Sequence, residues 1–226
     1  TAGNQKDVFA SVGADTTKLV GSKTNRVSFI DSDVGDLEKY DFIYISPGVP
    51  SGSQTVGAYT DAEVQVLLNY LDKGGRIFIQ SEDGAWTNVN AQSTALAQKM
   101  NAGFSIGRGV QSIAPATSNP NSPLTKGVAA NWNVVYCSEI VSNKTEGATP
   151  VFYATGNIGT VPFCMDITAG STVDAIPWGN VTVIADGDLW RGANNIDAGA
   201  FAKALVNNTL ENRITAATGV NPNLRV

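Results

Sequence analysis

The sequence contains no histidine among its 226 residues, and this absence excludes more functions than any other feature. Histidine is the usual general base, the usual partner of a nucleophilic serine or cysteine, and the commonest side-chain ligand of transition metals. A Ser-His-Asp or Cys-His site therefore cannot be built within this chain. On this ground we assign no catalytic residue and lean against an enzymatic function.

Charged residues are also scarce, since Asp, Glu, Lys and Arg together make up 15% of the chain. The 15 basic and 20 acidic residues give a net charge of −5, and no run of Lys or Arg could follow a phosphate backbone. We therefore expect no nucleic-acid partner. Low charge with abundant Gly, Asn, Thr, Ser and Ala is typical of secreted and surface-layer proteins, which predicts an extracellular or cell-surface location.

Only two cysteines are present, Cys137 and Cys164, and each lies in a strand-like run. An oxidising compartment favours a disulfide between them, whereas two buried thiols acting as small hydrophobic residues are the equal alternative. No apolar stretch approaches the roughly 18 residues needed to cross a bilayer, and the first residues lack the pattern of a secretory signal. We predict the disulfide and no membrane span.

The clearest structural pattern begins at Thr60 and ends at Gly84. Thr60 and Glu63 have the spacing of a capping box. An amphipathic helix is predicted from four aliphatic residues at helical spacing, Val64, Leu67, Leu68 and Leu71. The apolar run 77–79 then predicts a buried strand, which breaks at the polar turn 81–84. In an open parallel sheet such a turn lies at the carboxyl edge, where ligands usually bind.

Other segments give a mixed pattern of strands and helices. Buried strands are predicted at 27–30, 42–45 and 181–185, and helices at 90–100 and from Asp197 through Leu210. Residues 1–26 suit either a strand or a helix. Antiparallel hairpins are predicted from three apolar runs separated by turn residues, 134–141, 150–155 and 161–167.

The segment 103–133 is rich in Gly, Pro, Ser and Asn, so we expect a mobile functional loop or a surface insertion there. These patterns predict one α/β domain over residues 1–214, in which residues 103–170 form a loop and hairpin insertion. A C-terminal tail or linker is expected over residues 215–226.

Residues 31–36 superficially resemble a calcium loop. Their spacing fails the EF-hand pattern, which requires an oxygen ligand at the fifth position and a distal Glu at the twelfth. A polar turn before the next short helical segment is the more ordinary interpretation. We therefore assign no cofactor and keep calcium as the one alternative.

Four segments carry a resemblance to a known superfamily: LEKYDFIYISPGVP, YTDAEVQVLLNYLDKGGRIFI, SPLTKGV and VTVIADGDLWRGANNIDAGAFAKALVNN. They comprise 70 of the 226 residues, about a third of the chain. In these segments the chain resembles the class I glutamine amidotransferase-like superfamily, and especially its non-catalytic branches in cell-surface and gliding-type proteins. The resemblance implies a flavodoxin-like three-layer α/β sandwich with a mixed, mainly parallel sheet and an antiparallel hairpin extension.

The chain departs from the catalytic members of that superfamily at the nucleophile. In those members a cysteine follows the strand that corresponds to residues 76–80, and the loop corresponding to Pro47 and Gly48 helps to form an oxyanion hole. Here the turn reads Ser81-Glu82-Asp83-Gly84 and contains no cysteine. The resemblance therefore implies a pseudoenzyme, in which the loop geometry persists for binding without reaction.

Two acidic turns, at 81–86 and 186–191, each follow a predicted buried strand and each contain a tryptophan. We expect them to form one crevice with partly exposed tryptophans, suited to a glycan or a cation. The alternative is that both tryptophans pack under the segment 103–133. The expected ligand-binding residues are Gly48, Ser81, Glu82, Asp83, Trp86, Asp186, Asp188, Trp190 and Arg191.

Two functional hypotheses follow from these observations. The first is a non-enzymatic extracellular or cell-surface domain that binds a ligand, such as a glycan, or assembles with other surface-protein subunits into a surface structure or filament. The second is a hydrolase of carbohydrate or amide bonds that acts through carboxylates. Its candidate residues are Glu82, Asp83, Asp186 and Asp188.

Overall fold

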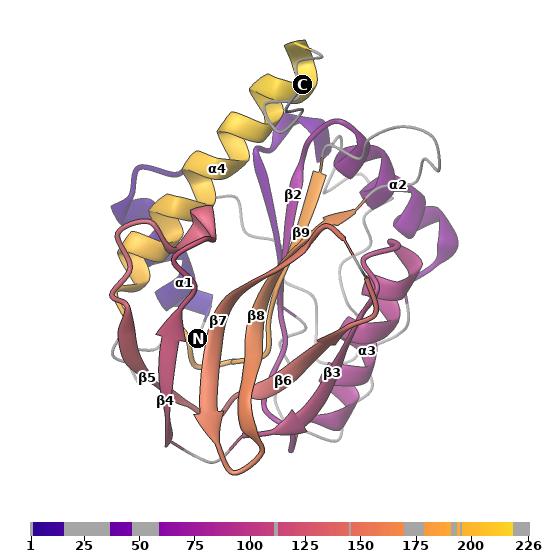
Figure 1. The fold of residues 1–226 in the computed structure, drawn as a ribbon. Helices are drawn as coiled ribbons and strands as arrows, with labels where there is room; N and C mark the ends of the chain where they lie inside the picture. Colours follow the sequence, from indigo (N-terminus) through magenta and orange to yellow (C-terminus); the bar gives the residue numbers. More distant parts are fainter. Residues whose placement is uncertain are drawn as a thin grey trace.

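The computed structural model describes residues 2–15, 37–46, 59–110, 113–144, 146–169, 179–190, 194 and 196–218. Its helices are α1 (Ala2–Ser11), α2 (Asp61–Asp72), α3 (Thr87–Lys99) and α4 (Ala198–Thr218), with short 3-10 helices η1 (Leu37–Lys39) and η2 (Pro123–Thr125). Its strands are β1 (Phe42–Ile45), β2 (Arg76–Gln80), β3 (Phe104–Gly109), β4 (Ile113–Ser118), β5 (Asn131–Val135), β6 (Ser138–Ser142), β7 (Ala148–Gly156), β8 (Gly159–Ala169) and β9 (Gly179–Ile184). Figure 1 shows their arrangement.

The main sheet has seven strands in the order β1-β2-β9-β8-β7-β4-β5, and β3 pairs with β6 in a separate two-stranded sheet. Among the described residues, β1 with β2 and β2 with β9 are the pairs that run parallel, and the other four pairings of the main sheet are antiparallel. The α/β class and the hairpins are confirmed. The expectation of a mainly parallel sheet is wrong for the described residues, because β8, β7, β4 and β5 continue the sheet as antiparallel neighbours.

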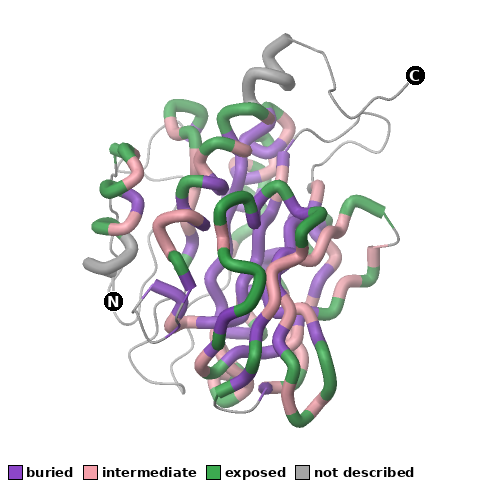
Figure 2. The backbone as a smooth tube through the Cα atoms, turned by 60° about the vertical axis from the view of Figure 1, so that its left-hand side comes forward, coloured by how far each residue is buried: buried purple, intermediate pink, exposed green. Residues whose placement is uncertain are grey.

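Helices cover both faces of the parallel strands, with α1 and α4 on one face and α2 and α3 on the other (Figure 1). Alternate residues of β2 serve the two faces. Phe78 packs with α1 and α4, whereas Ile77 and Ile79 pack with α2 and α3. The central strands are accordingly the most buried part of the chain, and exposed residues are concentrated on loops and outer helix surfaces (Figure 2).

Helix α2 confirms the capping box. The Thr60 hydroxyl oxygen accepts the Glu63 backbone N–H at 3.3 Å, and the Glu63 carboxylate accepts the Thr60 backbone N–H at 2.8 Å. The helix ends where Gly74 adopts a φ of 83°, which a residue with a side chain rarely adopts. A Cβ on the next residue, Gly75, would lie 2.3 Å from the Tyr70 ring, so glycine there lets the chain pass under that ring.

The segment 103–133 is not a loop. It forms β3, β4, η2 and the start of β5, and each of these strands has a partner. The buried positions of β4 are Ala114 and Ala116, on either side of Pro115, so small side chains build this strand where the sequence showed no hydrophobic alternation. Strands in this segment therefore form without large apolar residues at every buried position.

Both ends of the chain hold more helix than we expected. Residues 2–11, which suited either a helix or a strand, form α1. Helix α4 continues to Thr218, past the expected start of the tail at residue 215. The predicted strand 27–30 and the candidate calcium loop 31–36 lie outside the described residues.

A buried ion pair joins the amino end of β2 to β8. The Arg76 side chain is fully buried, and its guanidinium donates to the Asp166 carboxylate. Arg76 Nε also donates to Thr209 Oγ1 of α4 at 3.1 Å. Asp166 further accepts from Thr182 Oγ1 at 2.7 Å and from Asn180 Nδ2 at 2.9 Å. The two opposite charges and the surrounding hydroxyls and amides therefore fix α4 against the sheet.

Candidate functional site at the carboxyl ends of β2 and β9

The turns after β2 and β9 lie side by side. These two strands are parallel neighbours, and the Ser81 backbone N–H donates to the Ile184 carbonyl at 2.7 Å where they end. The predicted meeting of the two acidic turns is therefore present in the structure. It follows from topology, because parallel strands end at the same edge of a sheet.

Asn90 of α3 holds the first turn in shape. Its side-chain oxygen accepts the Ser81 hydroxyl at 2.6 Å and the Glu82 backbone N–H at 3.1 Å, while its side-chain nitrogen donates to the Asp83 carbonyl at 2.8 Å. Asn90 and Ser81 are both buried. The Ser81 hydroxyl is thus committed to an amide oxygen at the position where catalytic members of the resembled superfamily carry a nucleophile.

Asp186 is the buried acid of the second turn. One of its oxygens accepts the Asp188 backbone N–H at 2.8 Å, and the other accepts the Asn194 side-chain N–H at 2.5 Å. The pKa of Asp186 is raised to about 8, mainly by burial; the two hydrogen bonds lower it in part, and the nearby Asp188 and Glu82 add to the increase. Asp186 is therefore mainly protonated at neutral pH.

Gly187 brings the two turns into contact. A Cβ at this position would lie 1.7 Å from Oε1 of Glu82, which means that the Glu82 carboxylate lies directly over the Gly187 backbone. Any larger residue would require the Glu82 side chain to move. The close approach of Glu82 to the Asp186 turn therefore depends on a glycine here.

Trp190 lies in the core. It is 4% exposed, stacks on Phe201 of α4 with ring centroids 5.9 Å apart, and contacts Phe9 of α1. Its indole N–H donates to the Tyr44 hydroxyl at 2.8 Å. The expected crevice with two partly exposed tryptophans is therefore wrong for Trp190, because α1 and α4 supply enough aromatic surface to enclose it.

Trp86 differs from Trp190, since it is only half-buried and lies at the N-cap position of α3. Of the expected site residues, Ser81, Glu82, Asp83, Asp186 and Asp188 belong to the two adjoining turns. Gly48 and Arg191 lie outside the described residues. Within the part of the chain that the structure describes, no group of three or more acidic or cysteine side chains is arranged to hold a metal ion.

Cys137 and Cys164 are both free and both buried, so the predicted disulfide is wrong. The prediction assumed neighbouring strands in one hairpin region. Instead Cys164 lies on β8 of the main sheet, whereas Cys137 precedes β6, which pairs with β3 in the other sheet. Burial raises the pKa of both thiols well above the ordinary value.

Sequence reasoning missed the neutral side chains that support the site. The Tyr44 hydroxyl donates to the side-chain oxygen of Gln80, whose nitrogen donates to the Asp186 carbonyl at 2.9 Å. Asn194 connects Asp186 to the Val135 backbone N–H, which its oxygen accepts at 2.7 Å. The one available signal was Gln80 itself, a polar residue that ends an apolar strand.

No family model matches the sequence, and a search of curated proteins finds no match. Solved structures do resemble the chain. A putative GMP synthase subunit from Thermoplasma acidophilum is 14% identical with a TM-score of 0.57, over 96% of this chain and 92% of that one. A cytoplasmic protein from Salmonella typhimurium LT2 is 13% identical with a TM-score of 0.57, over 90% of this chain and 86% of the other.

A putative ThuA-like protein from Parabacteroides merdae is 11% identical with a TM-score of 0.53, and the match covers 100% of this chain and 88% of that protein. At these identities the likeness concerns the fold alone. No helix among the described residues is both long and apolar enough to span a membrane. The chain thus has a mixed α/β fold similar to that of these proteins.

Proposed function

We propose that this chain is a non-enzymatic domain, extracellular or on the cell surface, that binds a ligand or assembles with other subunits. The observation that carries the proposal is the environment of Ser81. Its buried hydroxyl donates to the amide oxygen of Asn90, which is too weak a base to remove the proton and generate a nucleophile. Because the chain contains no histidine, no imidazole is available to activate Ser81, although the turn follows the strand as a nucleophile turn would.

The two cysteines offer no substitute nucleophile. A thiol reacts as the thiolate, and burial raises the pKa of Cys137 and Cys164 far above neutrality. Nearby Asp186 raises both values further. Both thiols act as small hydrophobic residues of the core.

The finer assignment we propose is the non-catalytic, cell-surface branch of the amidotransferase-like superfamily, with β1, β2 and β9 as the parallel half of a flavodoxin-like sandwich. Helices on both faces of these strands support that half. The low content of charged residues and the abundance of Gly, Asn, Thr, Ser and Ala support the location. Antibody labelling of intact and of permeabilised source cells tests it, and signal only after permeabilisation contradicts it.

The absence of activity is tested with three substrates: glutamine, p-nitrophenyl acetate and a casein digest. We expect no turnover above buffer by the wild-type protein or by Ser81→Ala. Ser93→Ala is the matched control, because Ser93 is a second buried serine whose hydroxyl has no hydrogen-bond partner among the described residues. Turnover that survives Ser93→Ala and disappears in Ser81→Ala contradicts the proposal.

Self-assembly is tested by sedimentation velocity over a wide concentration range. Growth of the sedimentation coefficient with concentration supports assembly between copies of this chain. A constant monomer value removes self-assembly from the proposal and leaves ligand binding, or assembly with other subunits, as the remaining role.

The second candidate function is a carboxylate-dependent hydrolase of carbohydrate or amide bonds. It is favoured by the pKa of about 8 for Asp186, since a protonated carboxyl at neutral pH is what a general acid requires. Against it, the Asp186 residue is fully buried and its two oxygens already accept hydrogen bonds. Hydrolysis of p-nitrophenyl glycosides that is abolished by Asp186→Asn would favour this candidate over a binding role.

A further inference from the structure

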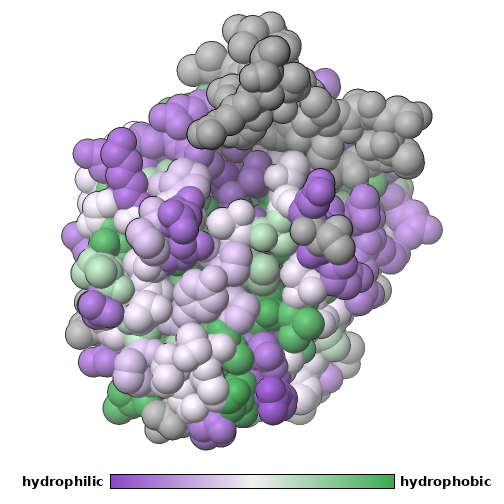
Figure 3. All heavy atoms as spheres, viewed as in Figure 1, coloured by the Kyte–Doolittle hydropathy of each residue, from purple (hydrophilic) through white to green (hydrophobic). Residues whose placement is uncertain are grey.

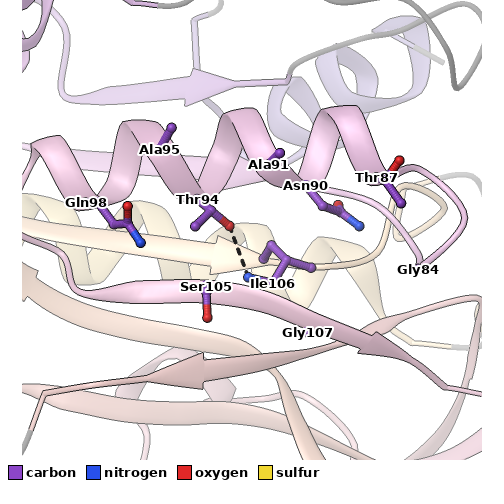
Figure 4. A pocket seen from close by; sticks show the side chains of 10 residues that line it. All are labelled: Gly84, Thr87, Asn90, Ala91, Thr94, Ala95, Gln98, Ser105, Ile106 and Gly107. Carbon is purple, nitrogen blue, oxygen red and sulfur yellow. Dashed lines mark hydrogen bonds between the residues drawn. The ribbon is translucent and has the colours of Figure 1, made fainter.

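A groove of about 400 Å³ lies between α3 and β3, beside the Ser81 turn but on the outer side of α3 (Figure 4). Its volume is near the lower end of the range of about 300–1,000 Å³ that small-molecule sites occupy. Its lining is Gly84, Thr87, Asn90, Ala91, Thr94, Ala95, Gln98, Ser105, Ile106 and Gly107. We propose that this groove binds a neutral, hydroxyl-rich small molecule of the carbohydrate class.

The lining contains no ionisable side chain, which argues for a neutral ligand. Hydroxyls and amides supply its polar groups, and alanines, glycines and Ile106 supply the rest. An anionic or cationic ligand would lose its hydration without meeting an opposite charge, which costs free energy. The net charge of −5 further disfavours anions.

The polar side chains divide into those that build the groove and those that are open to a ligand. Asn90 is occupied by the Ser81 turn, and the Thr94 hydroxyl accepts the Ile106 backbone N–H at 3.1 Å. Thr87 and Gln98 have no side-chain hydrogen bond to any described residue, and neither has Ser105, whose side chain points away from α3 in Figure 4. Figure 4 shows Asn90, Thr94 and Gln98 pointing from α3 toward β3. Gln98 presents both a donor and an acceptor, which suits a hydroxyl group.

The edge of β3 excludes a peptide strand as the occupant. The Ile106 N–H points away from β6 toward α3, where Thr94 accepts it, so the next position in the sheet is taken by the helix. A peptide could not add to this edge by backbone pairing.

Two glycines shape the end of the groove nearest the Ser81 turn. A Cβ on Gly84 would lie 2.8 Å from the Gly109 backbone nitrogen, so this end depends on glycine to keep the turn against β3. The half-buried Trp86 lies between the lining residues Gly84 and Thr87 in sequence, and the lining itself contains no aromatic side chain.

The surrounding surface favours a small polar ligand over a protein partner. On the face seen in Figure 3 the apolar residues form small patches separated by polar and weakly polar ones. Protein interfaces of standard size instead need about 800 Å² on each partner, with a continuous buried centre. The groove offers a short site whose lining combines apolar surface with a few neutral polar side chains.

The test is titration of the ¹⁵N-labelled protein with maltotriose, chitotriose and mannotriose as separate probes, followed by NMR. We expect at least one probe to give saturable shifts at Thr87, Thr94, Gln98 and Ser105. Gln98→Ala should weaken binding about tenfold, as loss of a hydrogen bond predicts. Gln65→Ala, an exposed glutamine on α2, is the matched control and should leave the affinity unchanged.

Absence of saturable shifts with all three probes would overturn the proposal, as would shifts confined to residues outside the groove. Equal affinity of wild type and Gln98→Ala would also overturn it. Thr87→Val is a second variant at the opposite end of the groove, so misfolding of one variant does not decide the result. The proposal does not depend on the absence of enzymatic activity, because none of the open groups belongs to the Ser81 and Asp186 turns.

Discussion

The two ends of strand β2 each carry a buried polar side chain, but the electrostatic surroundings of these two side chains differ. Arg76 and Gln80 point to the same face, on either side of Phe78, and both are buried. At the Arg76 end a buried cation meets a buried anion, Asp166. At the Gln80 end neutral amides and hydroxyls surround a buried acid, Asp186, that has no cation beside it among the described residues.

The hydrogen-bond network at the Arg76 end is therefore structural, whereas the network around Asp186 should respond to pH. At the Arg76 end the buried ion pair and its hydrogen bonds hold α4 against the sheet. A buried carboxyl with neutral hydrogen-bond partners and two other acids nearby instead changes its charge near neutral pH, mainly because burial disfavours the ionised form. Perturbed acids of this kind are concentrated at functional sites, and this one lies at the edge of the sheet where ligands bind.

Removal of the cation should have the largest effect. Arg76→Met leaves Asp166 buried without its partner, so we expect unfolding in urea to show a loss of about 3–5 kcal/mol. The double variant Arg76→Met with Asp166→Asn should recover part of this loss, since it also removes the unpaired charge. A loss below about 1 kcal/mol would show that the pair is not the centre of the network.

The pH dependence of stability should identify the responsive end. The folded pKa of Asp186, about 8, is above its ordinary value of 3.8, so between these values the folded state holds a proton that the unfolded state releases. This group therefore contributes stability at low pH that is lost as pH rises to about 8, with a slope of at most about 1.4 kcal/mol per pH unit.

Urea unfolding at pH 5, 6, 7 and 8 measures that slope. Asp186→Asn should flatten it, whatever constant offset the altered hydrogen bonds add. Glu82→Gln should move the midpoint to lower pH, because Glu82 is one of the groups that raise the Asp186 pKa. Equal slopes in wild type and Asp186→Asn would contradict the assignment.

Gly187→Ala should produce a smaller effect that sharpens the comparison. The new methyl group would displace the Glu82 carboxylate, the end of a flexible side chain, so we expect a loss of about 1 kcal/mol and a lower midpoint for Asp186. Gly199→Ala in α4 is the control, because a Cβ there comes no nearer than 3.4 Å to any atom. An unchanged midpoint in Gly187→Ala would mean that Glu82 does not act on Asp186.

The smallest expected effect is at the outer layer of the Arg76 network. Asn212 Nδ2 donates to Asn180 Oδ1 at 3.1 Å, so Asn212→Ala removes one partly buried hydrogen bond. Asn207→Ala is a matched change on the exposed side of the same helix and carries the same gain in helix propensity. We expect Asn212→Ala to be less stable than Asn207→Ala by about 0.5–1 kcal/mol in thermal unfolding. No difference would place Asn212 outside the network.

The sequence predicted the parts of the fold that large apolar residues and caps build. The capping box at Thr60, the strands around Ile43 and Ile79, and the Asp197 start of α4 are all present. It failed where small residues form strands, as at Ala114 and Ala116, since these carry little hydrophobic periodicity. The mainly parallel character expected of the sheet was also wrong, because turn residues set the spacing of hairpins without fixing which strands pair.

For the candidate site, topology was predictable and side-chain exposure was not. The meeting of the Ser81 and Asp186 turns follows from two parallel strands. The burial of Trp190 depends on Phe9 of α1 and Phe201 of α4, which belong to other elements. The supporting roles of Asn90 and Asn194 likewise depend on tertiary contacts. Such contacts leave no local pattern in the chain.

The position of Thr209 has a consequence for biosynthesis. The Arg76 side chain is separated from its α4 partner by 133 residues, so most of the chain must be synthesised before the two can meet. Until α4 leaves the ribosome, Arg76 and Asp166 remain exposed to solvent on one side, and the sheet lacks its covering helix. A nascent chain stalled before residue 209 should therefore stay sensitive to protease, and release of α4 should be the step that closes the domain.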